Sequence, residues 1–275
     1  MIRFLVAAML FLAPIAARAQ GTTTPGTTTP GTVTPGTITP GTVVWGLAAT
    51  FPPFEFVKDG KPAGFDLDFL EAVSKTMNVK PDVQSFEFKG LVPALMGKRI
   101  DAIISGMYIN PERLQVADFV PYILVGNQIV VKDGNPLKID GPMALCGHRV
   151  AAPVGTVFEQ AANKVNADCK AAGKPALIQL ALPGTTTCAL ALKEGRTDAI
   201  IVSTPTAAAL ESETPGSYAN GGPAYATDTK IGIAVLKGNT ALLDAIDKAV
   251  KAVVADGTYA KLLAKWNLPA GSSAF

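Results

Sequence analysis

One short pattern occurs twice in this chain and predicts the same local structure in both places. Residues 94–104 are Ala-Leu-Met-Gly-Lys-Arg-Ile-Asp-Ala-Ile-Ile, and residues 191–201 are Ala-Leu-Lys-Glu-Gly-Arg-Thr-Asp-Ala-Ile-Ile. Each copy is typical of a helix end, a tight polar turn and a short buried strand of a parallel sheet. A chain of 275 residues is long enough for two modest domains. The repeat therefore predicts an α/β protein with two similar lobes, each a mostly parallel sheet flanked by helices.

The residues that follow the two repeated strands are candidates for a binding site. Open α/β sheets bind ligands at the carboxyl ends of their strands. Here the strands end at Ser105–Tyr108 and at Val202–Thr204, so both segments are expected to face a cleft. Gly106 would let the backbone come close to a bound molecule.

Arg113 lies shortly after the first of these segments, and Pro111 favours a helix that begins there. A cation in the first turn of a helix is unfavourable against the helix dipole, so Arg113 is expected to have an anionic partner. That partner is either a neighbouring acid on the surface, Glu112 or Asp118, or the carboxylate of a ligand. A guanidinium can hold a carboxylate through two parallel hydrogen bonds.

Two segments predict that the chain leaves the first lobe, builds the second and returns. The sequence pattern changes between Asp118 and Val131, and it changes again near Gly222–Thr229. Residues 42–122 and 227–268 are therefore assigned to the first lobe, and residues 123–226, with the hinge segments, to the second. Two hinge crossings between lobes are a common arrangement for closure on a ligand.

The N-terminal part predicts export. Residues 1–19 have a basic Arg3, an apolar run over Phe4–Ala13, and small residues before a cleavage site near Ala19, as in a signal peptide. The apolar run is too short for a membrane span, and Pro14 interrupts it. Residues 20–41 are rich in Thr, Pro and Gly and carry no charge, which predicts a disordered tether.

Charge and cysteine content narrow the function classes. The 24 Lys and Arg nearly balance the 22 Asp and Glu, so a nucleic-acid partner is not expected. The chain has no Cys-x-x-Cys motif and a single His, so we expect no metal and no other cofactor. Cys146 and Cys169 flank one strand–helix unit and are predicted to form a disulfide in an oxidising compartment. Cys188 lies in an apolar helix and is expected to stay a buried thiol.

Several short pieces, taken in their order and spacing, match a known family. They are Phe51–Phe56, Gly64–Asp68, Gly90–Leu95, Asp101–Arg113, Asp118-Phe119, Gly155-Thr156, Gly195–Ala199, Gly232–Ala234, and Gly257–Tyr259 with Lys265-Trp266. Through them the folded part, about residues 42–268, resembles the bacterial extracytoplasmic solute-binding proteins of the polar amino-acid uptake class, which serve ABC importers. The resemblance implies the two-lobed periplasmic-binding-protein fold.

The resemblance also implies a ligand site. Phe51 and Phe88 would cover the ligand, and the backbone of Gly106 would line the first lobe. Arg113 would grip the ligand carboxylate with help from the backbone N–H of Thr156.

This sequence departs from the family pattern at three places near that site. Ser203 stands where the family usually has an acid that holds the ligand's α-ammonium, and a second acid is missing from Leu47–Thr50. Tyr108 would line the first lobe where a small Ser or Thr is usual, and it would fill space. Either Glu55 or Asp228 supplies the missing charge, or aromatic walls hold the cation, or the ligand has no primary ammonium. An amino acid and an amine-free carboxylate therefore both remain open.

The resemblance implies a monomeric, periplasmic binding protein. It would capture a small carboxylate ligand, an amino acid or an amino-acid-like molecule, between two lobes and deliver it to the membrane permease of an ABC importer. The alternative is a periplasmic dehydratase-type enzyme on the same fold. Such an enzyme needs a general acid in the cleft, and neither Ser203 nor Ala48 can serve as one. A soluble partner of a sensor receptor would use the same ligand chemistry and is not separable by sequence.

Overall fold

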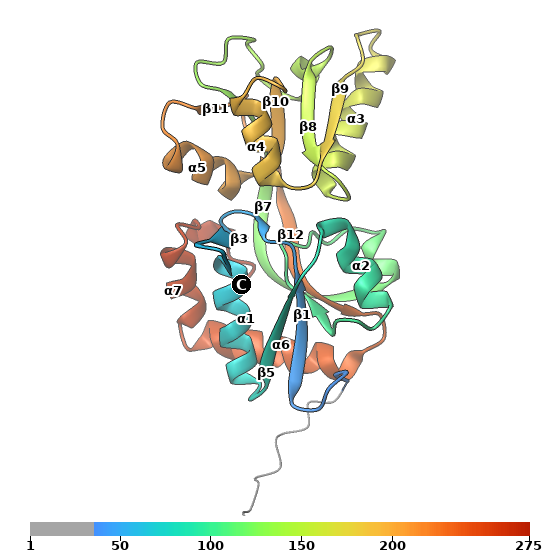
Figure 1. The fold of residues 1–275 in the computed structure, drawn as a ribbon, viewed down its shortest axis with the longest axis vertical. Coiled ribbons are helices and arrows are strands. Elements are labelled where there is room, and N and C mark those ends of the chain that lie inside the picture. The colour runs from blue at the N-terminus through green and yellow to red at the C-terminus, as the bar shows by residue number, and fades with distance from the viewer. Residues whose placement is uncertain (1–35) are drawn as a thin grey trace, which may run out of the picture. The chain divides into compact units, whose positions relative to one another are not determined.

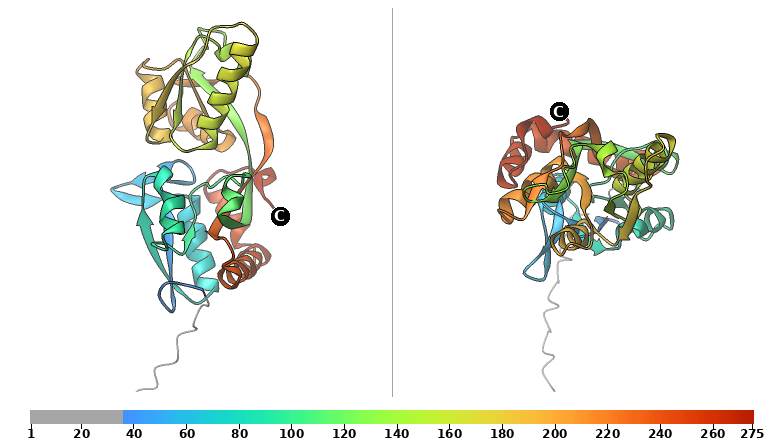
Figure 2. Two further views of the ribbon diagram at one scale, coloured as in Figure 1. Left: turned by 90° about the vertical axis from the view of Figure 1, so that its right-hand side faces the viewer. Right: turned by 90° about the horizontal axis from the view of Figure 1, so that it is seen from above.

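Two long strands run through both halves of the folded chain. The computed structural model describes residues 36–275, and in it β7 (Ala117–Lys132) pairs antiparallel with β12 (Tyr225–Leu236). Figure 1 shows a lobe at each end of this pair, and the turned view in Figure 2 shows the same two strands joining the lobes. The two predicted crossings are therefore this pair of strands. The predicted signal peptide and residues 20–35 of the predicted tether lie outside the described residues.

The first lobe is built on a sheet with the strand order β5-β1-β6-β12, in which β1 is parallel to both β5 and β6. A separate small antiparallel sheet joins β2, β3 and β4. The elements of this lobe are β1 (Thr42–Leu47), β2 (Thr50–Phe51), β3 (Glu55–Lys58), β4 (Lys61–Ala63), α1 (Phe65–Thr76), β5 (Lys80–Ser85), α2 (Phe88–Met96), β6 (Ala102–Ile103), the 3₁₀ helix η1 (Arg113–Gln115), α6 (Thr240–Ala255), α7 (Thr258–Lys265) and the 3₁₀ helix η3 (Ala270–Ser272).

The second lobe continues the same sheet from β7 through β10 and β8 to β9. β8 is parallel to β9 and to β10, while β10 and the short β11 pair antiparallel with β7. Its elements are the 3₁₀ helix η2 (Pro142–Leu145), β8 (Arg149–Pro153), α3 (Val157–Ala171), β9 (Ile178–Leu182), α4 (Thr185–Lys193), β10 (Ala199–Ser203), α5 (Thr204–Glu213) and β11 (Tyr218–Asn220). The predicted α/β fold with two mostly parallel lobes is thereby confirmed.

The lobe boundaries suggested by the sequence fall inside the paired strands β7 and β12. We retain residues 42–122 with 227–268, and residues 123–226, as the proposed division of the folded part. No helix in residues 36–275 is long and apolar enough to cross a bilayer.

Alternate residues of β1 bury the two faces of the first sheet. Val43, Trp45 and Leu47 belong to one apolar cluster, and Val44 belongs to another. The first cluster includes residues of α1, α6 and α7: Phe65, Phe69, Leu242 and Tyr259. The second includes Leu91 and Leu95 of α2. Successive side chains of a strand point to opposite faces, so a strand covered on both sides is apolar throughout, as β1 is.

The repeated pattern forms the same turn in each lobe. The N–H of Arg99 donates to the carbonyl of Ala94 at 2.9 Å, and that of Arg196 donates to the carbonyl of Ala191 at 2.8 Å. The following aspartate then clamps the neighbouring strand. Asp101 accepts a hydrogen bond from the N–H of Val44 in β1, and Asp198 accepts one from the N–H of Arg149 in β8, both at 2.8 Å. The repeat is therefore a structural device of the sheets.

Two elements differ from what the sequence predicts. The helix favoured at Pro111 is only the 3₁₀ helix η1, which begins at Arg113. The pattern of residues 83–88 predicts a strand that ends at Phe88, but Phe88 is the first residue of α2. β5 pairs with β1 in register from Thr42 opposite Lys80 to Leu47 opposite Ser85, so β5 ends where its partner ends. Phe88 therefore lies at the start of a helix, beyond the edge of the sheet.

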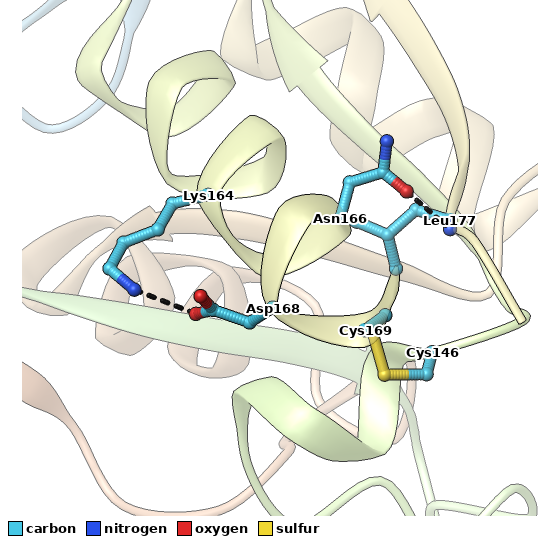
Figure 3. Close-up of a disulfide and its surroundings, with 6 residues drawn as sticks. All are labelled: Cys146, Lys164, Asn166, Asp168, Cys169 and Leu177. Atoms are coloured by element: carbon cyan, nitrogen blue, oxygen red, sulfur yellow. Dashed lines mark hydrogen bonds and ion pairs between the residues drawn. A yellow bond between two sulfur atoms is a disulfide. The ribbon is translucent and has the colours of Figure 1, made fainter. Parts of the chain in front are cut away.

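The predicted disulfide is present. Cys146 and Cys169 are bonded, with their Cα atoms 5.6 Å apart, and Cys188 is a free, buried cysteine. Figure 3 shows the bond joining the last turn of α3 to the segment after η2. In the same view Asn166 accepts a hydrogen bond from the N–H of Leu177 at 3.0 Å. The end of α3 is thus held both by a covalent bond and by a side-chain contact with the chain that leads to β9.

Candidate ligand-binding site

One cavity between the lobes brings together six of the seven residues predicted to bind a ligand. They are Phe51, Phe88, Gly106, Tyr108 and Arg113 from the first lobe and Thr156 from the second. The remaining lining residues are Thr50, Pro153, Val157, Phe158, Pro183, Gly184 and Thr185. The cavity thus lies beyond the carboxyl ends of β1, β6, β8 and β9, as expected for an α/β sheet.

Aromatic rings nearly fill this cavity. The ring of Phe51 stacks on Phe54 with centroids 5.1 Å apart, and Phe158 lies 5.9 Å from Phe51. Tyr108 meets Phe158 edge-on at 5.4 Å, so Tyr108 does occupy space that a smaller residue would leave open. The space that the centre of a water-sized sphere can reach is about 20 Å³. A space of about 10–15 Å³ on this measure holds a single water, so the closed cavity leaves little room between the rings.

Arg113 is a buried cation at the edge of the cavity. It is the first residue of η1 and only 8% exposed. Its guanidinium donates from Nη1 to the carbonyl of Tyr108 at 2.7 Å and from Nη2 to the carbonyl of Gly155 at 3.2 Å. It also lies over the ring of Phe88, 5.4 Å from the centroid. Burial lowers the pKa of Arg113 to about 10, so the side chain is charged at neutral pH.

No ion pair of residues 36–275 involves Arg113. The two surface acids considered as its partners are engaged elsewhere. Asp118 pairs with Lys237 at 2.7 Å, and Glu112 accepts a hydrogen bond from Gln160 at 3.2 Å. The hydrogen bonds of the guanidinium go to carbonyl oxygens, and the charge of Glu112 favours its protonated form without forming an ion pair with it. Such a cation is suited to a ligand carboxylate.

The floor of the cavity is held by buried acids. The carboxylate of Asp66 accepts hydrogen bonds from the N–H of Gly106 at 2.8 Å and from the hydroxyl of Tyr122 at 2.7 Å. Gly106 has φ +48, and a Cβ there would lie 2.5 Å from the ring of Phe51. A side chain at position 106 would therefore collide with the ring of Phe51. Asp66 lies in the first turn of α1, and its side chain holds the backbone of Gly106 in place.

Glu55 lies beneath Gly106 and is completely buried. Its Oε1 accepts a hydrogen bond from Ser105 at 2.9 Å. Burial raises the pKa of Glu55 well above its usual value, and the adjacent Asp66 raises it further. Burial also raises the pKa of Asp66, against the hydrogen bonds that it accepts. Burial thus disfavours the charged forms of both carboxyl groups, and it does so more strongly for Glu55.

Two helices of the second lobe begin at the cavity. Thr156 caps α3: its hydroxyl accepts from the N–H of Glu159 at 3.3 Å and donates to the carbonyl of Pro153 at 2.7 Å. Its own N–H makes a long bond of 3.4 Å to Pro153. The next N–H groups, of Val157 and Phe158, belong to the first turn of α3 and have no partner within the helix. This helix start can therefore receive an anion.

Ser203 is the one predicted site residue that does not line the cavity. Its hydroxyl accepts from the N–H of Thr206 at 3.2 Å and caps α5. The hydroxyl of Thr206 in turn donates to the carbonyl of Pro52 in the first lobe at 2.7 Å. Ser203 thus organises a contact between the lobes instead of facing a ligand.

Gly184 and Thr185 line the cavity but were not predicted from the sequence. A usable signal was present, because Gly184-Thr185 follows β9 and precedes or begins α4, as Gly155-Thr156 follows β8 and precedes α3. Phe158 has no such signal. Its role at the cavity depends on how the first turn of α3 meets Phe51.

Hydrogen bonds join the lobes around the cavity. Besides Arg113 to Gly155 and Thr206 to Pro52, the hydroxyl of Thr186 donates to the carbonyl of Thr50 at 3.3 Å. Gly184 packs so closely on Thr50 that a Cβ would lie 2.5 Å from its hydroxyl oxygen. The structure is therefore a closed arrangement of the two lobes. No group of three or more His, Cys, Asp or Glu in residues 36–275 is placed to hold a metal ion.

The sequence of the two-lobed part of the chain matches a known family. The model of the bacterial extracellular solute-binding proteins, family 3, covers residues 43–269, and the chain belongs to this family. The resemblance seen in the sequence is confirmed.

Several named relatives are binding proteins. The L-cystine-binding protein TcyJ of Escherichia coli (strain K12) is 33% identical over 226 residues, which is 80% of each chain. The L-arginine-binding protein of Pseudomonas aeruginosa is 32% identical over 231 residues, covering 80% of this chain and 86% of that protein. Among solved structures, an ancestral arginine-binding protein bound to arginine matches with a TM-score of 0.75 at 37% identity, over 82% of this chain and 98% of that chain. These relatives are not enzymes, and nothing supports the dehydratase alternative.

Proposed function

We propose that this protein captures a small carboxylate ligand, an amino acid or an amino-acid-like molecule, between its lobes and delivers it to the permease of an ABC importer. The observation that carries the proposal is Arg113: a buried cation without an ion pair, at a cavity that both lobes line. In this role Arg113 grips the carboxylate, the start of α3 at Thr156 adds N–H donors, and Phe51 and Phe88 cover the ligand.

Closure of the two lobes would favour the ligand-bound form of the protein. The bonds between the lobes form only when the lobes meet, and a ligand carboxylate would add a charge-assisted link between Arg113 and the start of α3. We further propose that the mature protein is monomeric and periplasmic after cleavage near Ala19. The family membership and the names of the relatives support delivery to an importer.

The experiment is calorimetric titration of refolded, ligand-free protein with small carboxylates, each compared with its methyl ester, in which the carboxylate charge is removed. L-Cystine, L-arginine, and aromatic and branched-chain acids form the panel. At least one acid should bind and its ester should not. Arg113→Ala should weaken binding of that acid by about 2–5 kcal/mol, as when one partner of a buried charge pair is removed.

Arg99→Ala is the matched control. Arg99 also lies over a phenylalanine ring, 5.3 Å from the centroid of Phe86, but it is not at the cavity. Its removal should leave affinity unchanged. Equal affinity of the wild-type protein and Arg113→Ala would refute the proposed site.

A further inference from the structure

The cavity contains a cation but no acid. Of its lining residues only Arg113 is charged, and the others are aromatic, apolar or hydroxyl-bearing. A zwitterionic amino acid brings both a carboxylate and an ammonium. The carboxylate has a partner here, while the ammonium would be buried beside a guanidinium without a negative charge of its own. Burying an unpaired charge is strongly unfavourable.

The nearby acids do not line the cavity. Glu55 lies behind Gly106, where its carboxyl group is bonded to Ser105 and adjacent to Asp66. Burial raises its pKa, which disfavours its charged form. Asp228 is exposed on β12 and is not part of the cavity wall. Ser203 caps α5.

The aromatic faces do not provide a replacement. The ring of Phe88 already has the guanidinium of Arg113 against it. Phe51 lies between Phe54 and Phe158, and Phe158 also meets Tyr108. An ammonium at the ring of Phe88 would approach the like charge of Arg113, so cation–π binding is disfavoured at that ring.

Tyr108 indicates what the ligand carries instead. Its hydroxyl is buried and has no hydrogen-bond partner. Burial raises its pKa, so it keeps its proton and can donate. A buried donor without a partner is costly, and a hydroxyl or keto oxygen of a ligand would satisfy it.

On the basis of the function proposed above, we propose that the ligand is a carboxylic acid with an apolar or aromatic body and no ammonium group: a plain, 2-hydroxy or 2-oxo acid. Arg113 holds its carboxylate, the rings of Phe51, Phe88 and Phe158 enclose its body, and Tyr108 donates to an oxygen next to the carboxylate. This ligand class differs from the amino acids in the names of the relatives.

The test compares ligands that differ only at the amine. Refolded protein is titrated with L-phenylalanine, phenyllactate, phenylpyruvate and 3-phenylpropionate, and with L-leucine and its 2-hydroxy and 2-oxo counterparts. L-Arginine and L-cystine are included. At least one amine-free acid should bind at least about tenfold more tightly than its amino acid, since the latter buries an unpaired charge. Arg113→Ala should weaken that binding by about 30-fold or more.

Two other results separate the failure of this inference from the failure of the proposed function. If amino acids bind as tightly as their amine-free partners or more tightly, and Arg113→Ala weakens them, the function stands and the ligand class is wrong. If no acid in either set binds, or if binding does not depend on Arg113, the proposed function fails and this inference fails with it.

A matched pair of variants tests the charge argument directly. Thr50 lines the cavity, so Thr50→Asp adds the missing negative charge there, and Thr50→Asn adds the same shape without charge. Thr50→Asp should shift the ratio of affinities toward the amino acid by about tenfold or more relative to Thr50→Asn. An unchanged ratio in two folded variants would overturn the inference. If Thr50→Asp does not fold, the wild-type ligand pairs decide it alone.

Discussion

At the scale of single residues, Arg113 lines the cavity, whereas the carboxyl groups of Glu55 and Asp66 are buried behind Gly106. The pair accepts hydrogen bonds from Ser105, Gly106 and Tyr122, and burial raises the pKa of both carboxyl groups. Folding therefore favours the protonated form of Glu55. Because the pKa of Glu55 is raised on folding, the folded protein holds a proton that the unfolded chain releases above about pH 4.5.

This gives a pH-dependent prediction. The stability contributed by protonated Glu55 is fully present below about pH 4.5 and is lost as the pH rises through the raised pKa. Each pH unit between the two pKa values costs about 1.4 kcal/mol. Glu55→Gln keeps the shape without the titration. Its unfolding free energy, measured by urea denaturation from pH 4 to pH 9, should fall less steeply with pH than that of the wild type.

The control for this experiment is Glu71→Gln, which changes an exposed glutamate of α1. Its pH profile should follow the wild type. Parallel curves for Glu55→Gln and the wild type would show that Glu55 does not hold a proton in the folded state.

The role of a residue was predictable where the chemistry of its side chain allows few kinds of partner. The sequence predicts an anionic partner for Arg113, either a surface acid or a ligand carboxylate, and the structure places Arg113 at the cavity. Ser203 and Phe158 were not predictable in the same way. A serine after a strand can either face a cleft or cap the next helix, and the contact of Thr206 with Pro52 exists only between the lobes. The position of Phe158 depends on tertiary packing against Phe51 and Tyr108.

At the scale of elements, the disulfide ties α3 to the start of its own strand–helix unit. It closes a loop with a sequence separation of 23 residues. Restriction of the unfolded chain by a loop of this size is worth about 3 kcal/mol. Reduction should lower the unfolding free energy of the wild type by about that amount, as measured by urea denaturation with and without reductant.

The double variant Cys146→Ser, Cys169→Ser should show no such response to reductant, while Cys188→Ser should respond like the wild type. Burial raises the pKa of the Cys188 thiol to about 12, so it should also resist alkylation in the folded protein at pH 8. A reductant effect that persists in the double variant would mean that this bond is not its source.

Element predictions succeeded where the pattern was local and failed at Pro111 and at the end of β5. The repeat predicted both turns and both strands, because the glycine-containing turn and the aspartate act within a few residues and on one neighbouring strand. The end of β5 was placed too late, because it is fixed by the length of β1 beside it. Nothing within residues 83–88 carries that information.

At the scale of the whole folded unit, closure depends on close approach at Gly184. Its position leaves no room for a methyl group against Thr50 when the lobes meet. Gly184→Ala should therefore oppose closure without disturbing either lobe. Its ligand affinity should fall by about tenfold or more, because the closed state is less populated. Calorimetric titration measures the affinity, and X-ray scattering with saturating ligand should give a larger radius of gyration than for the wild type.

Gly141→Ala is the control, since a Cβ at Gly141 meets nothing within 4 Å. It should bind and close like the wild type. Both variants should melt within a few degrees of the wild type in the absence of ligand, because the changed contact lies between the lobes and not in their cores. Undiminished affinity in Gly184→Ala would mean that the bound state is less tightly closed than this structure.

Two contacts fix the position at which the chain enters the first lobe. The N–H of Ile38 donates to Asp101 at 2.7 Å, and Asn239 donates to the carbonyl of Gly36 at 2.9 Å. These contacts fasten the incoming chain at the amino end of β1, whereas the cavity lies past its carboxyl end, about 20 Å away at about 3.3 Å per residue. Attachment through the N-terminal side would therefore act on the end of the first lobe opposite the cavity. The cavity side would stay accessible to a docking partner.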